Sequence, residues 1–529
     1  MNNFDGQLKL YPEICVDNFA SDIIFNVKIR AYILTHFHDD HMKNLEDYQF
    51  YRLLKENVDR VKFYCSPITK KFIETCEKYS HLSEFCTEIP CESPFIIHIS
   101  NAETVTATFC GSGHCPGSVM VFMEGLRGNV LFTGDFRLPL YCASRLPFFK
   151  ESSLASRDLF SIPTASQKAT KNNSNPEYNA KNVDDLYVDM TFFKPEIKTI
   201  PTREESVQVL VKFIKEFISQ NNEKKMGYFQ NLVYMKTSAR IGYEYVYQTI
   251  YSSTGYKVHV NNLIYKIYDK MPMIQSALTV DPYETPIHCC IYENKKRDVR
   301  KTDLMSSPFG NKKQQCNARN DFCINSNSVS SEARKTRPAI PCMLVQNEAN
   351  LNHSLRTKSI KIILSAMWFT DTAGVDNILV EYKPPKSELN TPAYKFYSSI
   401  YRLCYSFHSS LEEIVDFVDT LRPKKLFSIA LPESTGEKQI NQYFFDSNNR
   451  FIGFHQVNTN EKKREIDEKR NEAVIKKPPS DKLILRKRKS FELIGNHDSD
   501  SSDFSEKSND ELVFGSESDD DTERKKIKF

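Results

Sequence analysis

The densest group of potential metal ligands in the chain directly follows a short apolar run. Residues 32–34 predict the end of a buried strand, and four ligand-type side chains follow within six positions: His36, His38, Asp40 and His41. Alternate side chains of an extended chain point the same way, so the imidazoles of His36 and His38 face one side. Imidazoles beside a carboxylate suit zinc or a similar metal better than magnesium or calcium. A solvated polar loop is the alternative, but three of the chain's 12 histidines in six positions favour a metal site.

Further ligand-type residues follow predicted strands elsewhere in the first third of the chain. Asp17 follows residues 14–16, and His114 lies in a turn with glycines on both sides, which let the backbone bend closely around the imidazole. Residues 129–135 predict a strand that ends in Asp135. A carboxylate such as Asp17 can accept the free N–H of a metal-bound imidazole, although capping of a turn is an alternative role. Ligands in successive strand–turn units predict a metal site on the rim of a layered sheet.

The elements that must position these residues are predicted from periodicity and capping signals. A helix is predicted over residues 42–47, directly after the histidines. Two capping boxes predict the starts of amphipathic helices: Thr202 with Glu205, and Ser410 with Glu413. His408 lies just ahead of the second helix, where backbone N–H groups favour an anion. Another strand ends in Asp189, and the helices and strands that alternate after it predict a second α/β unit.

Length and composition limit the classes of protein to which the chain can belong. At 529 residues it should divide into two or three units, and 40% hydrophobic residues suffice for substantial cores. A net charge of only +3 means that any basic surface is local. No apolar run reaches the ~18 residues that span a bilayer, and the first residues lack the features of a signal peptide. We therefore expect no membrane association, and we expect the 14 cysteines to be reduced thiols of the cytosol or nucleus.

Three polar stretches interrupt the pattern. Residues 143–182 and the basic residues 293–337 predict flexible insertions, and the basic one would either lie against a phosphate backbone or be merely solvated. After residue 456, blocks of like charge and few apolar residues predict a disordered tail. Residues 486–489 resemble a nuclear-import signal, so we expect the protein in the nucleus.

The ligand-type residues match a known family in order and spacing. Asp17, the run 36–41, His114 and Asp135 resemble the four metal-binding motifs of the metallo-β-lactamase fold. Lactamases, thioesterases and nucleases share that fold, so the fold alone does not choose the reaction.

Two further motifs narrow the resemblance. Asp189 and residues 406–408 resemble the additional motifs of the β-CASP nucleases, in which a second domain is inserted into the first and covers its active site. Residues 426–432 lack the histidine that RNA-processing members carry, which resembles the DNA-repair branch. Over residues 1–435, apart from the insertions, the chain is most similar to the Artemis-like nucleases of that branch. The segments that carry this likeness are 4–7, 64–67, 113–120, 134–137, 242–245, 367–369 and 406–410.

The resemblance implies a fold class and a domain order. The fold class is α/β: a metallo-β-lactamase αββα sandwich with an inserted β-CASP α/β domain and a disordered C-terminal tail. The metallo-β-lactamase domain would occupy residues 1–190 and 396–456, and the β-CASP domain residues 191–395. The tail would occupy residues 457–529.

The resemblance also implies roles for individual residues. Two divalent cations, zinc or alternatively magnesium or manganese, would bind at the active site to His36, His38, Asp40, His41, His114 and Asp135. The catalytic set would be Asp17, Asp40, Asp189 and His408. Within it, His408 would stabilise charge on a phosphate or protonate the leaving 3′ oxygen. Lys236 would contact a DNA phosphate, and a solvated surface lysine is the alternative.

A separate zinc site is implied in the inserted domain. His259, His288, Cys290 and Cys342 resemble a structural zinc site, and two histidines with two cysteines suffice for a closed tetrahedral site. Without the resemblance, the same side chains would be interpreted as ordinary buried thiols and imidazoles.

The function implied by the family is that of a metal-dependent, structure-selective DNA nuclease. It would cut hairpins, overhangs and junctions, with 5′-exonuclease activity as well, in double-strand break repair by non-homologous end joining. DNA would be its substrate, and DNA-dependent protein kinase and an end-joining ligase complex would be partners, although the tail shows no convincing partner-binding segment. A 5′-exonuclease of interstrand-crosslink repair and a catalytically inactive repair scaffold are alternatives. Hydrolysis of a small thioester or lactam is a further one, which Asp189, His408 and the long insertion argue against.

Overall fold

The computed structural model describes residues 4–146, 182–195, 197–220, 229–290, 358–369, 377–383, 397–431 and 437–454. All of them belong to one compact unit, residues 1–458, and the second unit, residues 459–529, lies outside the described part. The predicted insertion at 293–337 and most of the polar stretch 143–182 lie outside it as well. None of the described helices has the length and apolar character that crossing a bilayer requires.

The N-terminal part of the chain folds into a four-stranded parallel sheet with helices on one face. Its strands, in spatial order, are β1 (Ile14–Val16), β2 (Ala31–Ile33), β3 (Lys62–Cys65) and β4 (Cys86–Glu88). The connections contain α1 (Ser21–Ile24), α2 (Tyr48–Glu56), α3 (Pro67–Thr75) and the 3-10 helix η1 (Ser80–Phe85). Successive side chains of a strand point to opposite faces. Tyr32 and Phe63 accordingly join the aromatic core beside the helices, whereas Ile33 and Tyr64 belong to the core on the other face.

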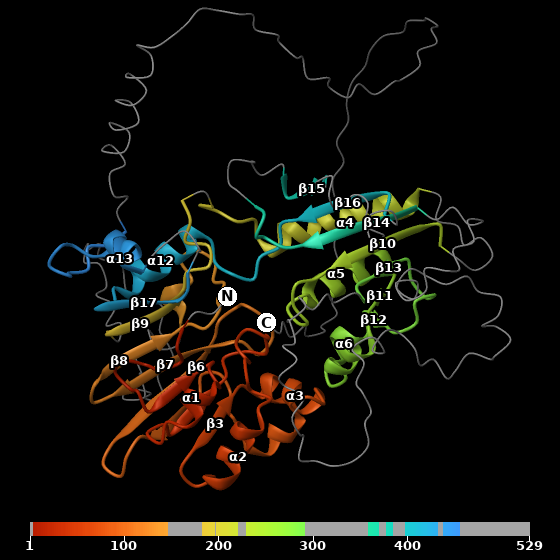
Figure 1. Cartoon of the computed structure of the whole chain (residues 1–529). Helices are drawn as coiled ribbons and strands as arrows, with labels where there is room; N and C mark the ends of the chain where they lie inside the picture. The colour runs from red at the N-terminus through yellow and green to blue at the C-terminus, as the bar shows by residue number, and fades with distance from the viewer. Residues whose placement is uncertain are drawn as a thin grey trace, which may run out of the picture. The chain divides into compact units, whose positions relative to one another are not determined.

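A six-stranded mixed sheet packs against that other face. Its spatial order is β17 (Lys425–Ala430), β9 (Asp185–Asp189), β8 (Gly128–Phe132), β7 (Val119–Gly125), β6 (Thr104–Gly111) and β5 (Pro94–His98). Ile14 and Ile33 of the first sheet share a core with Phe109, Val121 and Phe132 of the second. The outer face carries the 3-10 helix η2 (Ala143–Arg145), α12 (Leu411–Leu421) and α13 (Glu437–Phe444). This helix–sheet–sheet–helix order fits the metallo-β-lactamase fold (Figure 1).

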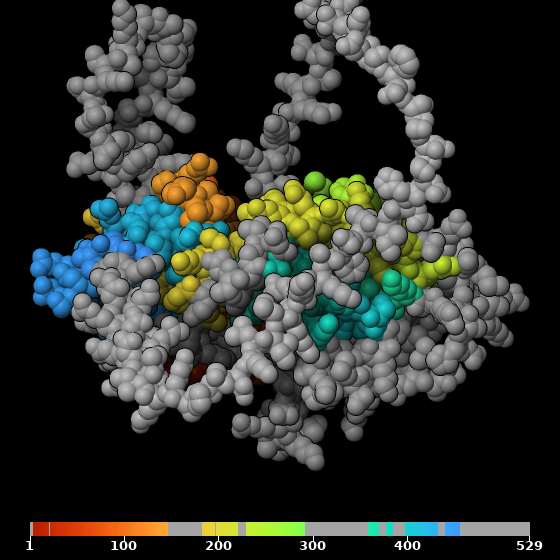
Figure 2. All heavy atoms as spheres, turned by 90° about the horizontal axis from the view of Figure 1, so that it is seen from above, coloured from red at the N-terminus to blue at the C-terminus, as the bar shows by residue number. Residues whose placement is uncertain are grey.

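A third sheet is built from the chain between β9 and β17, which are parallel neighbours in the second sheet. Its spatial order is β12 (Leu278–Thr279), β11 (Val258–His259), β13 (Ile287–His288), β10 (Asn231–Lys236), β14 (Lys358–Leu364), β16 (Ser399–Leu403) and β15 (Leu379–Glu381). Its helices are α4 (Arg203–Ser219), α5 (Glu244–Thr254), α6 (Asn262–Ile267) and α7 (Pro272–Gln275). We call this sheet with its helices the inserted lobe; Figure 2 views it from above, with α4 in yellow and β14 in teal.

The inserted lobe extends slightly further along the chain than the sequence predicts. The sequence predicts that the first domain resumes at residue 396. Instead, β16 pairs in parallel with β14, through partners such as Ile360 with Ser399. The chain therefore returns to the first two sheets only after Leu403.

Both predicted capping boxes are confirmed. Thr202 and Glu205 bond reciprocally at the start of α4, and Ser410 and Glu413 do so at the start of α12. These bonds satisfy backbone N–H groups that have no partner within the helix, so the sequence signal and the helix start coincide.

Two predicted elements are wrong at the metal-ligand loops. Residues 42–47 form turns rather than a helix, because Asn44 has a left-handed φ of +62° and Asp47 is the N-cap of α2, which begins only at Tyr48. The strand expected to end in Asp135 ends earlier, at Phe132.

Gly134 explains the close approach of the loop that carries Asp135. Its φ is +54°, and a Cβ at this position would lie 2.9 Å from Thr35 Oγ1. A glycine therefore lets the loop after β8 lie directly against the loop after β2.

The cap of α12 gives a test of this local structure. Ser410→Ala should lower the free energy of unfolding by about 1 kcal/mol, because the serine Oγ accepts the N–H of Glu413. Urea unfolding followed by circular dichroism measures the change. Ser252→Ala, at an exposed position inside α5, is the matched control and should not lower the midpoint. An unchanged midpoint for Ser410→Ala would contradict the role of the cap.

Candidate metal centre

The ligand-type residues lie on loops that leave the same edge of each sheet. Both β6 and β8 run antiparallel to β7, and β9 runs parallel to β8. The loops with His114 and Asp135, and Asp189 as the last residue of β9, therefore lie at one edge of the six-stranded sheet. The loops after β1 and β2 likewise leave one end of the parallel sheet. A hydrogen bond from Val119 N to Thr35 O, 3.1 Å long, joins the two sets of loops.

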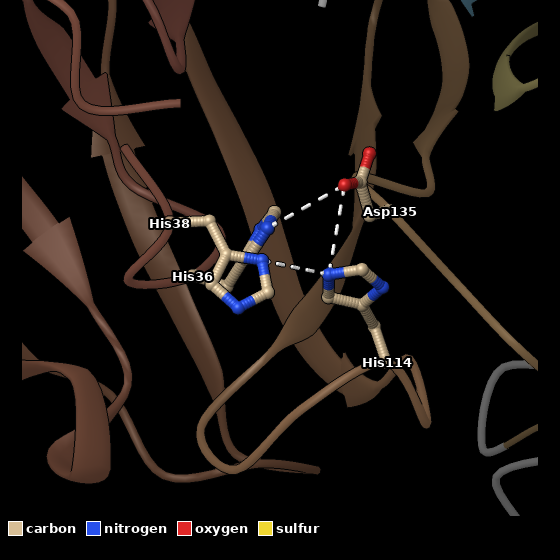
Figure 3. Close-up of side chains that lie close together, drawn as sticks. All are labelled: His36, His38, His114 and Asp135. Carbon is tan, nitrogen blue, oxygen red and sulfur yellow. Dashed lines mark hydrogen bonds and ion pairs between the residues drawn. The ribbon is translucent and has the colours of Figure 1, made fainter. Parts of the chain in front are cut away.

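Histidine nitrogens converge on one carboxylate oxygen. The ligand atoms of His36, His38, His114 and Asp135 all lie within 4.8 Å of one another (Figure 3). Asp135 Oδ2 lies 3.6 Å from His36 Nε2 and 3.6 Å from His114 Nε2. It also lies 3.3 Å from His41 Nε2. All these side chains are buried, so the structure brings these predicted ligands together away from water.

Backbone carbonyls determine which nitrogen of two imidazoles carries the proton. His38 Nε2 lies 3.2 Å from Ile241 O, and His114 Nδ1 lies 3.0 Å from Phe407 O. A carbonyl oxygen only accepts, so both of these nitrogens carry protons. His38 Nδ1 and His114 Nε2 are then left as acceptors with a free lone pair. Ile241 belongs to the inserted lobe, so this lobe fixes the tautomer of a ligand on the first sheet.

Asp17 orients the other two imidazoles, His41 directly and His36 through Thr35. Asp17 Oδ2 lies 2.8 Å from His41 Nδ1 and also accepts the hydroxyl of Thr35 at 2.6 Å. Asp17 Oδ1 accepts the N–H of Thr35 at 2.8 Å. Because the Thr35 proton goes to Asp17, Thr35 Oγ1 accepts from His36 Nδ1, which is 3.0 Å away. This geometry agrees with the predicted role of Asp17 as a carboxylate that fixes an imidazole.

The remaining ring nitrogens have the character of metal ligands. His38 Nδ1 and His114 Nε2 are 3.0 Å apart, and burial lowers the pKa of both residues, which keeps the rings neutral. Two lone pairs at this distance repel unless a positive charge lies beside them. His36 Nε2 and His41 Nε2 are buried and have no hydrogen-bond partner among the described residues. Nitrogen donors around a carboxylate are the ligand set of zinc-type cations, so these residues fit a divalent metal.

Carboxylate partners raise the pKa of two histidines, His41 and His408. Burial lowers the pKa of His41, but Asp135 and Asp17 raise it well above its ordinary value. Burial also lowers the pKa of His408, but Asp189 and Asp135 raise it to about 9. Burial raises the pKa of Asp135, and the charges of His41 and His408 nevertheless hold it well below its ordinary value. Asp135 is therefore ionised at neutral pH, and binding of a cation there would release protons from its neighbours.

Asp189 and His408 form a pair beside Asp135. His408 Nδ1 lies 2.6 Å from Asp189 Oδ2 and 4.0 Å from Asp135 Oδ2. Asp189 Oδ1 accepts both the N–H and the hydroxyl of Thr191, at 3.0 and 2.6 Å, which fixes the carboxylate. Ligand atoms of Asp135, Asp189 and His408 also lie within 4.8 Å of one another. Asp189 and His408, which the sequence links only by resemblance, are thus in direct contact.

Asp40 faces the centre from an open pocket. The pocket is lined by His38, Asp40, His114, Asp135 and His408 from the first two sheets, and by residues 238–240 of the inserted lobe. Burial raises the pKa of Asp40, but neighbouring His41 and His38 bring it below its ordinary value, so the carboxylate is ionised. Its oxygens are not part of the four-atom group in Figure 3, and its role as a ligand stays a prediction.

A second group of ligand-type residues lies in the inserted lobe. His259 in β11, His288 in β13 and Cys290 are buried, and their ligand atoms lie within 4.8 Å of one another. His259 and His288 are paired across adjacent strands, and their Nδ1 atoms are 3.0 Å apart. Cys342, the fourth predicted ligand, lies outside the described residues. The structure therefore brings together three of the four residues predicted to bind a structural zinc.

Lys236 ends β10 and is half-buried, but it is not among the residues that line the pocket. Its predicted contact with DNA stays a prediction.

The sequence analysis missed contacts that involve backbone oxygens. The carbonyls of Ile241 and Phe407 carry no residue-type signal, so no motif could have identified them. Arg203 was also missed. It donates to His114 O at 2.8 Å and to Ser406 O at 3.1 Å, and its place next to the predicted cap Thr202 is the only sequence signal it offers.

Comparisons with known proteins find similarity to DNA-repair proteins. Residues 343–434 match the family described as DNA repair metallo-beta-lactamase. The chain is 28% identical to Protein artemis of Gallus gallus over 445 residues, which is 83% of this chain and 49% of that protein. It is 28% identical to Protein artemis of Homo sapiens over 440 residues, 82% of this chain and 50% of that protein. It is 30% identical to 5′ exonuclease Apollo of Rattus norvegicus over 192 residues, 36% of this chain and 28% of that protein.

The chain thus spans about half the length of the Artemis proteins that it matches.

Removal of one ligand tests the metal centre. His114→Ala should lower the divalent metal bound to the purified chain, because it removes one of the three histidines that are grouped with Asp135 as potential ligands. Plasma mass spectrometry of protein dialysed against metal-free buffer measures the content. His81→Ala, an exposed histidine in η1, is the matched control and should retain the metal. Equal metal in both variants would contradict the centre.

Proposed function

We propose that the chain, an Artemis-like member of the DNA-repair metallo-β-lactamase family, is a metal-dependent, structure-selective DNA nuclease. The proposed substrates are hairpins, overhangs and junctions of single- and double-stranded DNA, and the proposed setting is double-strand break repair by non-homologous end joining. One observation carries the proposal. The buried Asp135 is shared between the histidine cluster and the Asp189–His408 pair, at a pocket that the inserted lobe helps to line.

We assign the inserted lobe to the β-CASP class of domains and the first two sheets to the metallo-β-lactamase domain. The support is the order of elements, because the lobe interrupts the second sheet between β9 and β17. The predicted ranges 1–190, 191–395 and 396–456 then need only the extension of the lobe to Leu403. Residues 457–529 stay a predicted disordered tail.

The proposed reaction is hydrolysis of a phosphodiester. Water attacks phosphorus, the bond from phosphorus to the 3′ oxygen breaks, and the product keeps a 5′ phosphate. Two divalent cations would supply Lewis acidity and lower the pKa of water. Zinc suits the nitrogen-rich ligand set, and magnesium and manganese are the alternatives. The residues that would hold the cations are His36, His38, Asp40, His41, His114 and Asp135.

His408 is the proposed source of the proton for the leaving oxygen. Its raised pKa, about 9, keeps the imidazole protonated at neutral pH. Asp189 holds its Nδ1, which leaves Nε2 for a phosphate or for the 3′ oxygen. Asp17 acts as a positioning residue, because it touches His41 and Thr35 and not the pocket.

The 5′-exonuclease function is the second candidate, and the likeness to 5′ exonuclease Apollo over 192 residues favours it. Such an enzyme could act in interstrand-crosslink repair. A hydrolase of a small thioester or lactam is less well supported, because the pocket is also lined by residues of the inserted lobe. An inactive scaffold is less well supported as well, since the predicted ligands of the histidine cluster are all present and buried together.

Partners and compartment are proposed on the sequence alone. DNA is the proposed substrate. DNA-dependent protein kinase and an end-joining ligase complex are proposed as partners by resemblance, and the nucleus is proposed from the basic residues 486–489.

Cleavage assays test the proposed function. Purified protein should cut labelled hairpin DNA, and a chelator should abolish cutting, while RNA should be a poor substrate. Asp40→Asn should abolish cutting, because it removes a proposed ligand of the cations, with DNA binding largely retained. His81→Ala serves as the unaffected control. Undiminished cutting by Asp40→Asn would exclude this site, and a protein that cuts no nucleic acid would exclude the function.

The cysteine and histidine group of the inserted lobe has its own test. The double variant His288→Ala with Cys290→Ala should lose about one zinc per chain, since a closed zinc site needs four ligands, and should keep the metal held around Asp135. Cys289→Ala removes a neighbouring buried thiol that is not in the group and is the matched control. Zinc content that is unchanged in the double variant would remove the structural zinc from the proposal.

A further inference from the structure

The pocket beside the histidine cluster has an uneven distribution of charge. Among its described lining residues, the carboxylates are Asp39, Asp40 and Asp135, and Arg240 is the one lysine or arginine. Arg240 comes from the loop between β10 and α5 of the inserted lobe. A polyanion that enters the pocket is repelled by the carboxylates, and Arg240 opposes them together with His408 and the proposed cations.

The loop that carries Arg240 is held on both sides of it. Ser238 N donates to Tyr243 Oη at 3.1 Å. Ile241 is fully buried, and its carbonyl accepts the N–H of His38 at 3.2 Å. Arg240 directly precedes Ile241, whose carbonyl orients the predicted metal ligand His38. The backbone of Arg240 is therefore held in place relative to His38.

Gly242 brings the same loop close to the segment before His408. Its φ is +109°, and a Cβ on Gly242 would lie 2.8 Å from the ring of Phe407. The backbone next to Arg240 thus packs against the chain that leads to the Asp189–His408 pair. The loop that carries Arg240 is therefore held against both His38 and Phe407.

One ion-pair partner of Arg240 in the pocket is Asp39. Arg240 Nη2 lies 3.4 Å from Asp39 Oδ1, and the two side chains are 15% and 40% exposed. This separation is longer than that of a charge-assisted hydrogen bond, and the Asp39 side chain is open to water. A guanidinium binds the oxygens of a phosphate with two parallel charge-assisted hydrogen bonds, which a lysine cannot do. A phosphate that enters the pocket can therefore compete with Asp39 for the guanidinium.

We propose that Arg240 binds a DNA phosphate adjacent to the scissile linkage and exchanges its ion pair with Asp39 for this contact. The proposal rests on the nuclease function proposed above, and it adds a substrate-binding residue from the inserted lobe. In the free protein, Asp39 holds the guanidinium in the pocket, so less side-chain freedom is lost when DNA binds. Because a phosphate contact is independent of base identity, Arg240 should affect all DNA sequences equally.

Equilibrium binding to a labelled DNA hairpin tests the proposal. In the Asp40→Asn background, which keeps the DNA intact, Arg240→Ala should weaken binding by about tenfold and reduce the slope of log K against log salt by about one. Arg240→Lys should keep the salt slope but recover only part of the affinity, since the charge remains and the bidentate contact is lost. Metal content should stay at the level of the parent protein, because Arg240 is outside the ligand group.

A double-variant comparison separates phosphate binding from simple neutralisation of Asp39. If Arg240 contacts phosphate, Arg240→Ala weakens binding by a similar factor whether residue 39 is aspartate or carries Asp39→Asn. If Arg240 only neutralises Asp39, the Asp39→Asn change restores the affinity lost in Arg240→Ala, and the proposal is overturned. Arg52→Ala is the matched control, because it removes an arginine from an ion pair with Glu56 on α2, outside the pocket.

Single-turnover cleavage distinguishes a failure of the proposed Arg240 contact from a failure of the proposed nuclease function. If the unaltered protein cuts hairpin DNA while Arg240→Ala binds and cuts it as the unaltered protein does at every salt concentration, only the phosphate contact of Arg240 is wrong. If the unaltered protein cuts no DNA in the presence of divalent metal, the nuclease function is wrong and the role of Arg240 falls with it.

Discussion

The ionised carboxylate of Asp135 is only 5% exposed to solvent, and a charge buried to this extent is stable only beside opposite charge. The imidazoles of His36, His41 and His114 present a nitrogen to its Oδ2 within 3.6 Å, and His408 lies 4.0 Å away. Burying several imidazoles around one oxygen costs free energy and would not stabilise a hydrophobic core. This arrangement is the environment of a site built for cations, and the chain is arranged to keep it in place.

The orientation of each ring depends on a different part of the chain. Asp17 at the end of β1 fixes His41 and, through Thr35, His36. The carbonyl of Phe407, just before α12, fixes His114. The carbonyl of Ile241, in the inserted lobe, fixes His38. The orientation of the four rings therefore depends on the two sheets, the returning chain and the inserted lobe together.

Much of the centre could be predicted from residue types and spacing, and the reason is physical. His36 and His38 alternate on an extended chain, glycines flank His114, and capping boxes mark α4 and α12, so each signal arises from local backbone geometry. Asp189 and His408 are 219 residues apart in sequence, and only a family resemblance linked them before the structure brought them within 2.6 Å. The turns at residues 42–47 were mistaken for a helix because the left-handed Asn44 has no strong sequence signal. The carbonyls of Ile241 and Phe407, and the pairing of Asp39 with Arg240, depend on tertiary structure alone.

Anomalous diffraction from crystals of the full chain, recorded on both sides of the zinc edge, examines the centre most directly. The geometry predicts a peak bound by His36 Nε2, His114 Nε2, Asp135 Oδ2 and His38 Nδ1, with His38 alone using its δ nitrogen because its Nε2 bonds to Ile241. Strong metal density elsewhere in zinc-loaded crystals, with none beside Asp135, would contradict a cation centre at this carboxylate.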